Sequence, residues 1–430
     1  MIGVVADDMT GAHDTGSMFV KSGALVYVFS YGNGREELAI DQGELPDVLI
    51  LDTDSRFDPP DVAYAKVRRA AKTLWELGYR RFYKKICSAF RGNIGSELDG
   101  MLDALGEDFA GVVAGFPKNG RQTIEGIHYI HGAKLEDSEF RFDPVHPMTS
   151  SNLVDLLQKQ TERKVALLDH TTIEQGAAYL GAAAEQLRSE YSYVILDVVD
   201  QNSLKTIAEA LHHLPVLGAS SALAEELLSL PSNRDVQATI ALPKQAGIGV
   251  LCAAGSLMPQ TAAQVEAMRQ GCAPVLELES RKMLEPAKRV EAIKELSQRI
   301  ADLLVRGENV VVHTSNNPEV VAQTKALGQS RGLSTIAVSR LISEALAEVV
   351  NNCVEGLGLN RLIVAGGDTS AAVCSRLGVA GMRIWQEIAP GIPSCISLTG
   401  PPLFLVLKPG GFGKPDFFSQ AVAHLQGKSE

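Results

Sequence analysis

Short apolar runs alternate with helix-length amphipathic segments over about the first half of the chain, a pattern typical of α/β domains. The apolar runs predict buried strands at Ile2–Ala6, Leu25–Phe29, Val48–Leu51, Phe82–Ile86, Val112–Ala114, Val165–Leu168, Val194–Leu196 and Val216–Leu217. The amphipathic segments between them predict helices that include Asp61–Leu77, Leu153–Gln160 and Ile173–Ser189. Such alternation requires crossover connections, so we expect a mostly parallel, doubly wound sheet flanked by helices.

The same pattern restarts after a polar stretch, Pro231–Asp235 and Pro243–Gly247, which we interpret as a linker. Later apolar runs predict strands at Ile248–Ala253, Val310–His313, Leu362–Ala365 and Leu403–Leu407. One helix is expected from about Gln260. Another, Pro286–Arg306, would have as its apolar face Val290, Ile293, Leu296, Ile300, Leu303 and Leu304. The chain therefore predicts two α/β domains, 1–232 and 247–430, with an active site in the cleft between them.

Composition limits the class of protein. The 430 residues are 45% hydrophobic and 21% charged, which is ordinary for a globular protein, and the net charge of −11 disfavours nucleic acid or an anionic membrane as partner. Six scattered cysteines without a C-x-x-C pair indicate reduced thiols. No apolar stretch approaches the ~20 residues of a membrane span, and a strand at the very start disfavours a signal peptide. We expect a cytoplasmic protein, and assembly as a homodimer stays open.

The first predicted strand is followed directly by two carboxylates, Asp7 and Asp8. A helix that extends to about Gly23 is expected to come next, with Thr10 as its N-cap candidate. Ligands of open α/β sheets bind beyond the carboxyl ends of the strands, and adjacent like charges are costly for structure alone. The structural alternative is that one aspartate caps the helix and the other is solvated.

Basic residues follow three other strands of this half, in Asp52–Arg56, Lys84–Gly92 and Phe116–Arg121. Arginine and lysine in such positions suit a ligand that carries a carboxylate, which arginine can bind through two hydrogen bonds. The alternative is that these charges only tie loops together by pairing with Asp52, Asp54 or Glu97.

The second half places glycines at strand ends instead, in Gly255-Ser256, in Gly366–Thr369 before a predicted helix Ala371–Leu377, and in Lys408–Gly413. Glycine lets a backbone approach an oxyanion, and the amides at a helix start attract phosphate. Three such clusters favour a nucleotide site, although Asp368 or Thr369 would also serve as a plain N-cap. There is no P-loop motif.

Other familiar catalytic signals are absent from the sequence. The histidines His13, His128, His131 and His146 are scattered, and the spacing of the middle two is more often structural than metal-binding. The segment Gly218–Ala222 lacks the G-x-S-x-G nucleophile elbow. Metal ligands are therefore left unassigned.

Together these motifs resemble the four-carbon acid sugar kinase family from the first residues to about Phe418. The matching segments are Ala6–Gly11, Lys84–Gly92, Phe116–Arg121, Gly255-Ser256, Gly366–Thr369 and Lys408–Gly413. The resemblance implies an ATP-dependent kinase of tetronate-type acids such as threonate, erythronate or 3-oxo-tetronate. It also implies an N-terminal substrate-binding domain and a C-terminal nucleotide-binding domain.

The resemblance assigns roles to individual residues. It implies that the anionic sugar acid is bound by Asp8, Arg56, Lys85, Cys87 and Ser88, to which the basic strand ends add Arg91 and Arg121. It implies that ATP is bound by Ser256, Gly366, Gly367, Asp368, Thr369, Gly410 and Gly411. As a mechanism we expect Asp8, or failing that Asp7, to orient or deprotonate the substrate hydroxyl. Arg91 would offset charge on the transferred group, and Mg²⁺ would bridge the phosphates.

One motif departs from the family pattern. The family has close to Lys-Ile-Asp-Ser-Thr-Leu-Arg-Gly where this chain has Lys85-Ile-Cys-Ser-Ala-Phe-Arg-Gly92, so Cys87 and Ala89 replace two hydrogen-bonding residues. This change is expected to alter which acid binds.

Two alternatives to the kinase function stay open: a metal-dependent lyase or aldolase with Asp7 and Asp8 as ligands, and a binding protein without catalysis.

Overall fold

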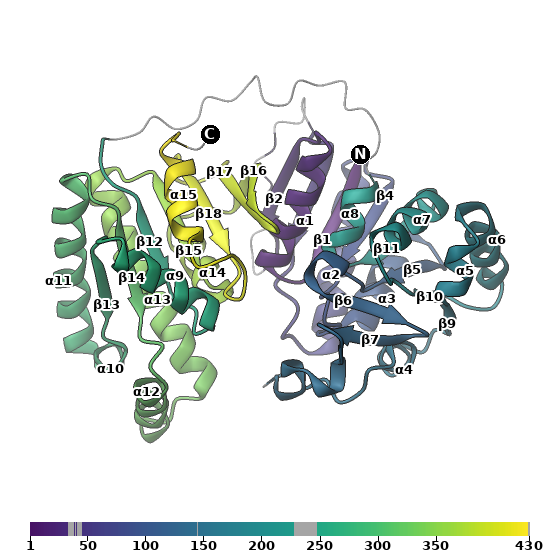
Figure 1. Ribbon diagram of the computed structural model, residues 1–430, viewed down its shortest axis with the longest axis horizontal. Helices are drawn as coiled ribbons and strands as arrows, with labels where there is room; N and C mark the ends of the chain where they lie inside the picture. Colours follow the sequence, from purple (N-terminus) through teal and green to yellow (C-terminus); the bar gives the residue numbers. More distant parts are fainter. Residues whose placement is uncertain (33–37, 39, 41–44, 144, 228–246, 429–430) are drawn as a thin grey trace. The chain divides into compact units, whose positions relative to one another are not determined.

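The structure is a computed structural model, and it describes residues 1–32, 38, 40, 45–143, 145–227 and 247–428. The chain divides into two compact units, Met1–Val236 and Gln237–Glu430 (Figure 1). The expected linker segment Pro231–Asp235 lies outside the described residues, as does Pro243–Gly247 except for its last residue. No helix in the described ranges is long and apolar enough to cross a membrane.

The first unit is built on a parallel sheet with the strand order β2-β3-β1-β4-β11-β5-β10-β9. Its strands are β1 (Ile2–Ala6), β2 (Val26–Ser30), β3 (Val48–Asp52), β4 (Arg81–Lys85), β5 (Ala110–Val113), β9 (Val165–Leu168), β10 (Tyr193–Leu196) and β11 (Val216–Ala219). A small antiparallel sheet, β6 (Arg121–Ile124), β7 (Ile127–Ile130) and β8 (Ala133–Lys134), is added after β5. The parallel sheet confirms the fold class expected from the alternating pattern.

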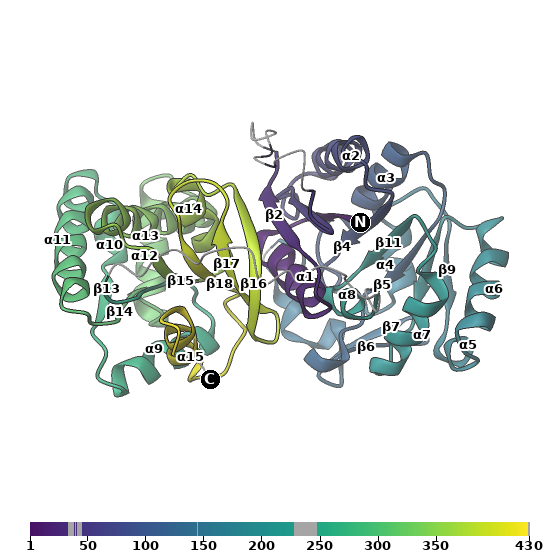
Figure 2. The ribbon, with the colours of Figure 1, turned by 90° about the horizontal axis from the view of Figure 1, so that it is seen from above.

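Helices cover both faces of this sheet. They are α1 (Met9–Lys21), α2 (Pro60–Glu76), α3 (Ile94–Leu105), α4 (Leu153–Gln158), α5 (His170–Glu174), α6 (Ala177–Arg188), α7 (Gln201–Leu211) and α8 (Ser221–Leu227). Figure 2 shows α2 and α3 on one face and α1, α7 and α8 on the other. Right-handed crossovers explain this division, because the chain passes along the sheet in one direction through α2 and α3 and in the opposite direction through α1 and α7.

The second unit has the strand order β13-β14-β12-β15-β18-β17-β16. Its strands are β12 (Leu251–Ala254), β13 (Val275–Leu278), β14 (Val310–Thr314), β15 (Arg361–Ala365), β16 (Gly381–Ala389), β17 (Ile392–Ser397) and β18 (Phe404–Lys408). All neighbours are parallel up to β18, whereas β17 is antiparallel to both β18 and β16. Strands β13, β16 and β17 were not predicted from the sequence.

The helices of the second unit also pack on both faces of its sheet. They are α9 (Pro259–Gln270), α10 (Ser280–Met283), α11 (Pro286–Val305), α12 (Pro318–Ser330), α13 (Thr335–Leu357), α14 (Gly367–Arg376) and α15 (Phe417–Leu425). In Figure 2, α9 and α15 lie on one face, and α13 and α14 lie on the other. An apolar core that includes Val250, Cys252, Ile363, Phe404 and Phe418 fills the side of α15.

Three local predictions were wrong. The N-cap of α1 is Asp8 rather than Thr10, because the Asp8 carboxylate accepts a hydrogen bond from the Gly11 amide. The single helix expected over Ile173–Ser189 is divided into α5 and α6 by Gly176, whose φ of 94° no helix accommodates. Val290 is 68% exposed, because it lies at the edge of the apolar face of α11.

The first unit also buries an ion pair. Lys84 on β4 and Glu97 on α3 lie 2.9 Å apart with side chains that are 0% and 1% exposed, and the Ser55 hydroxyl donates to the same carboxylate. Breaking a buried pair leaves one charge desolvated without a partner, which costs far more than losing an exposed pair.

We therefore expect Lys84→Met to destabilise the protein by about 3–5 kcal/mol. Lys72→Ala, which breaks the exposed Lys72–Glu76 pair, is the matched control and should cost about 0.5 kcal/mol or less. Urea unfolding measures both. A double variant with Glu97→Met should recover much of the loss, and a Lys84→Met variant no less stable than the control would contradict the role given to the buried pair.

Candidate functional site

In the first unit the carboxyl ends of three strands meet at one level. Ala6 pairs with Asp52 on β3 and with Lys85 on β4, so the loops after these strands emerge side by side. The strand order reverses here, because β2 and β3 lie on one side of β1 and β4 lies on the other. Such a reversal opens a crevice in which ligands of doubly wound sheets bind.

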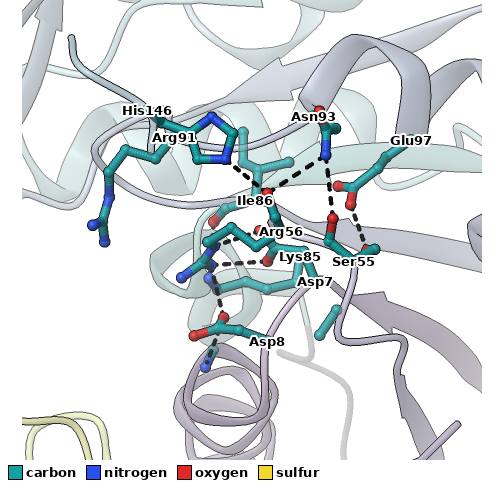
Figure 3. Close-up of polar contacts among 12 residues, drawn as sticks. Asp7, Asp8, Ser55, Arg56, Lys85, Ile86, Arg91, Asn93, Glu97 and His146 are labelled. Atoms are coloured by element: carbon teal, nitrogen blue, oxygen red, sulfur yellow. Dashed lines mark hydrogen bonds and ion pairs between the residues drawn. The ribbon is translucent and has the colours of Figure 1, made fainter. Parts of the chain in front are cut away.

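Arg56 holds both aspartates of the first loop (Figure 3). Its Nε donates to Asp7 Oδ2 at 2.7 Å and its Nη2 to Asp7 Oδ1 at 2.9 Å, and the same Nη2 donates to Asp8 Oδ1 at 2.7 Å. Asp8 also accepts from the Thr10 hydroxyl at 2.6 Å. One guanidinium therefore offsets the repulsion between two adjacent carboxylates.

The two aspartates differ in accessibility. The Asp7 side chain is 2% exposed and the Asp8 side chain 23%. Burial raises the pKa of Asp7, but the nearby charges of Arg56 and Lys84 outweigh it and lower that pKa well below its usual range. Asp7 is thus a permanently charged partner of Arg56, and Asp8 is the carboxylate that a ligand can reach. The structural alternative was half right, since Asp8 caps α1, but Asp7 is buried rather than solvated.

Two side chains that were not predicted as site residues fix the backbone that carries Arg56 (Figure 3). The Asn93 amide donates to the carbonyls of Ser55 and Asp58 at 3.2 and 2.8 Å, and His146 Nε2 lies 2.8 Å from the Arg56 carbonyl. No sequence motif indicated either residue, because each acts on a backbone carbonyl far along the chain.

Cys87 lies among several cations. Burial raises the pKa of the Cys87 thiol, but the charges of Arg91, Arg56 and Lys85 outweigh it and lower that pKa to about 7. Lys85 is itself 4% exposed, and its Nζ donates to the Ile86 carbonyl at 2.8 Å. The cationic wall expected from the sequence is thus present, and a thiol that titrates near neutral pH stands where the family has an aspartate.

Arg91 and Arg121 extend this wall. Arg91 donates to Asp143 at 2.8 Å, and Arg121 Nη1 donates to the Asn119 carbonyl. Within the described ranges, the Nε of each guanidinium is buried and has no hydrogen-bond partner. Both groups interact with the charge of Cys87, so they add to the positive charge of this wall.

Ser88 belongs to the same loop, where its carbonyl lies 2.8 Å from His128 Nε2. His128 is buried and therefore serves to hold this loop, which agrees with the structural role preferred for it. The alternative of loop-tying ion pairs is right for Lys84, which pairs with Glu97. Arg91 and Lys118 also form ion pairs, with Asp143 and Glu225.

The second unit repeats this geometry. Ala254 of β12 and Lys408 of β18 both pair with Ala365 of β15, so the loops that follow emerge at one edge. The strand order reverses between β12 and β15. A cavity of about 330 Å³ lies at this edge, and its wall includes Ser256, Gly366, Gly367, Asp368, Thr369 and Gly410. The structure therefore brings together six of the seven predicted nucleotide-binding residues, while Gly411 lies against Met258 of the same wall.

The glycines of this cavity are required by close approach. A Cβ on Gly255 would lie 2.1 Å from Thr369 Oγ1, and one on Gly410 would lie 2.1 Å from Ser256 Oγ. Gly366 has a φ of 119° and precedes α14, which begins at Gly367 rather than Ala371. No side chain caps α14, so the predicted capping role of Asp368 or Thr369 was wrong and the first amides of the helix are left for a ligand.

An apolar wall completes the cavity, formed by Val320, Val321, Val338 and Ile342 of α12 and α13. These residues were not predicted from the sequence, because their helices carry no motif. Apolar side chains opposite free amides suit a planar base and its phosphates.

Within the described ranges, no group of three or more histidine, cysteine, aspartate or glutamate side chains is arranged to bind a metal ion. Asp7 and Asp8 are bound by Arg56, and a cation between them would have to displace this guanidinium. The geometry therefore does not favour the lyase alternative.

Comparison with known proteins agrees with this division of the chain. Residues 2–227 match the family model of a sugar-binding N-terminal domain, and residues 251–418 match that of a nucleotide-binding C-terminal domain. The chain belongs to the four-carbon acid sugar kinase family. Full-length relatives named 3-oxo-tetronate kinase, described next, show that it is an ATP-dependent sugar-acid kinase.

Several relatives match over nearly the whole chain. A 3-oxo-tetronate kinase of Pseudomonas savastanoi pv. phaseolicola is 34% identical over 99% of this chain and 98% of its own. A 3-oxo-tetronate kinase of Haemophilus influenzae is 30% identical over 98% and 99%. Among solved structures, a Salmonella typhimurium LT2 protein matches with a TM-score of 0.83 at 28% identity over 98% of both chains.

The lowered pKa of Cys87 predicts that iodoacetamide alkylates this thiol in preference to the buried Cys252. The thiolate is the reactive form, so the rate at Cys87 should rise with pH and reach half its maximum near pH 7. Cys252, whose pKa burial raises to about 12, is the internal control and should not react in this range. Mass spectrometry of the two peptides measures both rates. A Cys87 rate that rises only near the ordinary thiol value of 9.0 would contradict the assignment.

Proposed function

We propose that this kinase phosphorylates a hydroxyl of a four-carbon acid of the 3-oxo-tetronate type. The names of the full-length relatives support this substrate class. The observation that carries the proposal is the position of Asp8, a partly exposed carboxylate fixed by Arg56 beside several buried cations. Such a site binds an acid and also offers a proton acceptor to one of its hydroxyls.

The substrate carboxylate is bound by the guanidinium groups of Arg91 and Arg121. Both lie close to Cys87, and each has a buried Nε with no hydrogen-bond partner in the described part of the chain. A carboxylate accepts two parallel hydrogen bonds from arginine, which gives the substrate a fixed orientation. Lys85 adds positive charge on the side of Asp8, where its Nζ would lie 2.9 Å from a Cβ on Gly11.

Asp8 then orients the reacting hydroxyl. A new bond forms between this oxygen and the γ-phosphorus, the bond from that phosphorus to the β,γ-bridging oxygen breaks, and ADP leaves with the electron pair. The hydroxyl proton passes to the Asp8 carboxylate. Arg56 keeps Asp8 in place, while Lys85 and Arg91 offset the charge on the transferred group.

ATP binds in the cavity of the second unit. The amides at the start of α14, which no side chain caps, fit its phosphates. The glycines let the loops pack closely, with Gly255 against Thr369 and Gly410 against Ser256. Ser256 supplies a hydroxyl, and the wall that includes Val338 and Ile342 suits the base. Mg²⁺ bound to the phosphates would reduce their charge. Asp368, whose carboxylate belongs to the cavity wall, would be its protein ligand.

The replacements at Cys87 and Ala89 change the selection of the acid. Cys87 is 7% exposed and Ala89 2%, so neither offers the hydrogen bonds to substrate hydroxyls that aspartate and threonine would. A site with fewer such groups accepts an acid with fewer hydroxyls facing this wall. A 3-oxo acid, in which a carbonyl replaces one hydroxyl, fits this description.

An assay of ADP release with MgATP over a panel of four-carbon acids tests the proposed function, and turnover with none of these acids would contradict it.

Asp8→Asn should lower kcat by about 10²–10⁴-fold, because an amide cannot accept the hydroxyl proton. Asparagine is as good an N-cap as aspartate, so α1 should keep its stability. ATP affinity, measured by calorimetry, should change by less than about twofold.

Asp54→Asn is the matched control for Asp8→Asn, since Asp54 is an exposed aspartate of the loop after β3. This variant should keep normal turnover. Near-normal kcat in Asp8→Asn would show that Asp8 is not the proton acceptor.

Arg91→Met should raise the KM for the acid by about tenfold or more, since a charge-assisted hydrogen bond contributes about 1.5–3 kcal/mol. The KM for ATP should stay unchanged, because Arg91 belongs to the first unit. Steady-state kinetics measure both constants. Arg141→Met, at an exposed arginine of the same unit, is the control, and a rise confined to the KM for ATP would contradict the assignment.

A further inference from the structure

Lys408 is the last residue of β18, and its side chain is fully buried in the second unit. Within the described ranges no carboxylate pairs with it, and burial is the one cause that lowers its pKa, to about 7. A buried lysine without an acidic partner is costly, and such groups are usually retained for function. The residue belongs to the motif Lys408–Gly413, but the proposed mechanism gives it no role.

The Lys408 ammonium lies inside the glycine loop that follows it (residues 409–413, the closing loop). Its Nζ donates to the carbonyls of Pro409, Gly410 and Phe412 at 2.7, 3.0 and 3.0 Å. A fourth oxygen, Thr261 Oγ1, lies at 3.1 Å and itself donates to the Gly410 carbonyl. All four neighbours accept, which matches an ammonium group and not a neutral amine, whose lone pair would face an acceptor.

Gln264, a residue of α9, forms hydrogen bonds with the same loop. The Gln264 amide donates to the carbonyls of Phe412, Gly413 and Lys414 at 3.0, 3.0 and 3.1 Å. Lys408 and Gln264 together therefore turn successive carbonyls of the closing loop toward the interior of the unit.

This inward orientation determines where the amides of the loop point. The structure has no cis peptide bonds in its described part, and in a trans peptide the carbonyl and the following N–H point in opposite directions. With the carbonyls of Pro409, Gly410 and Phe412 directed at Lys408, the N–H groups of Gly410, Gly411 and Gly413 point away from it. None of these three amides donates to a backbone carbonyl in the described ranges.

The outward face of the closing loop adjoins the nucleotide cavity. Gly410 is part of the cavity wall, and its missing Cβ would lie 2.1 Å from Ser256 Oγ. Successive free amides on one side of a loop form a concave site for an anion. Gly410 thus presents a free amide in the cavity wall, and the direction of this amide depends on the Pro409 carbonyl that Lys408 holds.

We propose that Lys408 is a positioning residue for ATP, which holds the closing loop with its amides turned toward the phosphates. This inference rests on the proposed function, because it takes the cavity as the ATP site. Lys408 does not touch the nucleotide. It acts through the backbone of residues 409–412, and its buried charge adds to the attraction for the polyphosphate from beneath the loop.

The test compares three substitutions in steady-state kinetics and in calorimetric titration with a non-hydrolysable ATP analogue. Lys408→Met removes the charge and three carbonyl contacts, and should raise the KM for ATP by about tenfold or more with the KM for the acid unchanged. Gln264→Met removes carbonyl contacts but no charge, and should raise the same constant by a smaller factor. Lys414→Met removes an exposed charge from the same segment, and should leave both constants unchanged.

A merely structural role would give a different pattern. If Lys408→Met lowers the melting temperature and raises both KM values together, or if it leaves the KM for ATP unchanged, the proposal is wrong. If Lys408→Met does not fold, Gln264→Met still tests the proposal. This variant removes hydrogen bonds to the closing loop but keeps the buried Lys408 and its contacts. An unchanged affinity for the analogue in that variant overturns the inference.

The design also separates this inference from the proposed function. Absence of ADP release by the wild-type protein with every acid would refute the proposed substrate class. The titrations with the analogue need no acid, so they test Lys408 independently of that outcome.

Discussion

The contact between Arg56 and the two aspartates after β1 is the interaction on which the candidate site of the first unit depends. Two adjacent carboxylates at the end of a buried strand repel each other, and one guanidinium that binds both removes this cost. Arg56 must therefore be held accurately, which explains why Asn93 and His146 bind the backbone around it. Because Asp7 takes up the buried side of Arg56, Asp8 remains accessible and keeps a fixed direction. A rigid, partly exposed carboxylate is what phosphoryl transfer to a hydroxyl requires.

The two units would each bind an anionic ligand, but with different groups: side-chain cations in the first unit and backbone amides in the second. Each places its site where the strand order reverses, between β1 and β4 in one and between β12 and β15 in the other. In the binding mode that we propose, side-chain cations such as Arg91 bind the ligand of the first unit. In the second unit backbone amides bind the phosphates, and the cation, Lys408, contacts the carbonyls on the other side of the loop. Side chains that form two hydrogen bonds suit a small acid whose orientation must be selected, and amides at a helix start suit phosphates that are common to all nucleotides.

Much of this arrangement could be predicted from the sequence because it follows from the order of strands and helices. The alternating pattern predicted the fold class, and parallel strands then brought Asp8, Arg56 and Lys85 to one edge. Sequence analysis ranked Asp8 before Asp7, but it could not predict the difference in burial between them, since residues far along the chain produce that burial. Strands β16 and β17 were missed because they pair antiparallel and interrupt the alternation. The apolar wall with Val338 was missed because a helix face toward a cavity has the same pattern as a helix face toward a core.

The thiol at position 87 has a consequence for how binding of the acid depends on protons. In the binding mode that we propose, the thiolate of Cys87 and the carboxylate of the substrate are both anions beside Arg91 and its neighbouring cations. When the carboxylate binds, its negative charge opposes the thiolate and the pKa of Cys87 rises, so the complex takes up a proton from solution near neutral pH. The affinity for the acid then decreases as the pH rises through about 7. A relative with aspartate at this position would lack this coupling, because its carboxylate stays charged throughout that range.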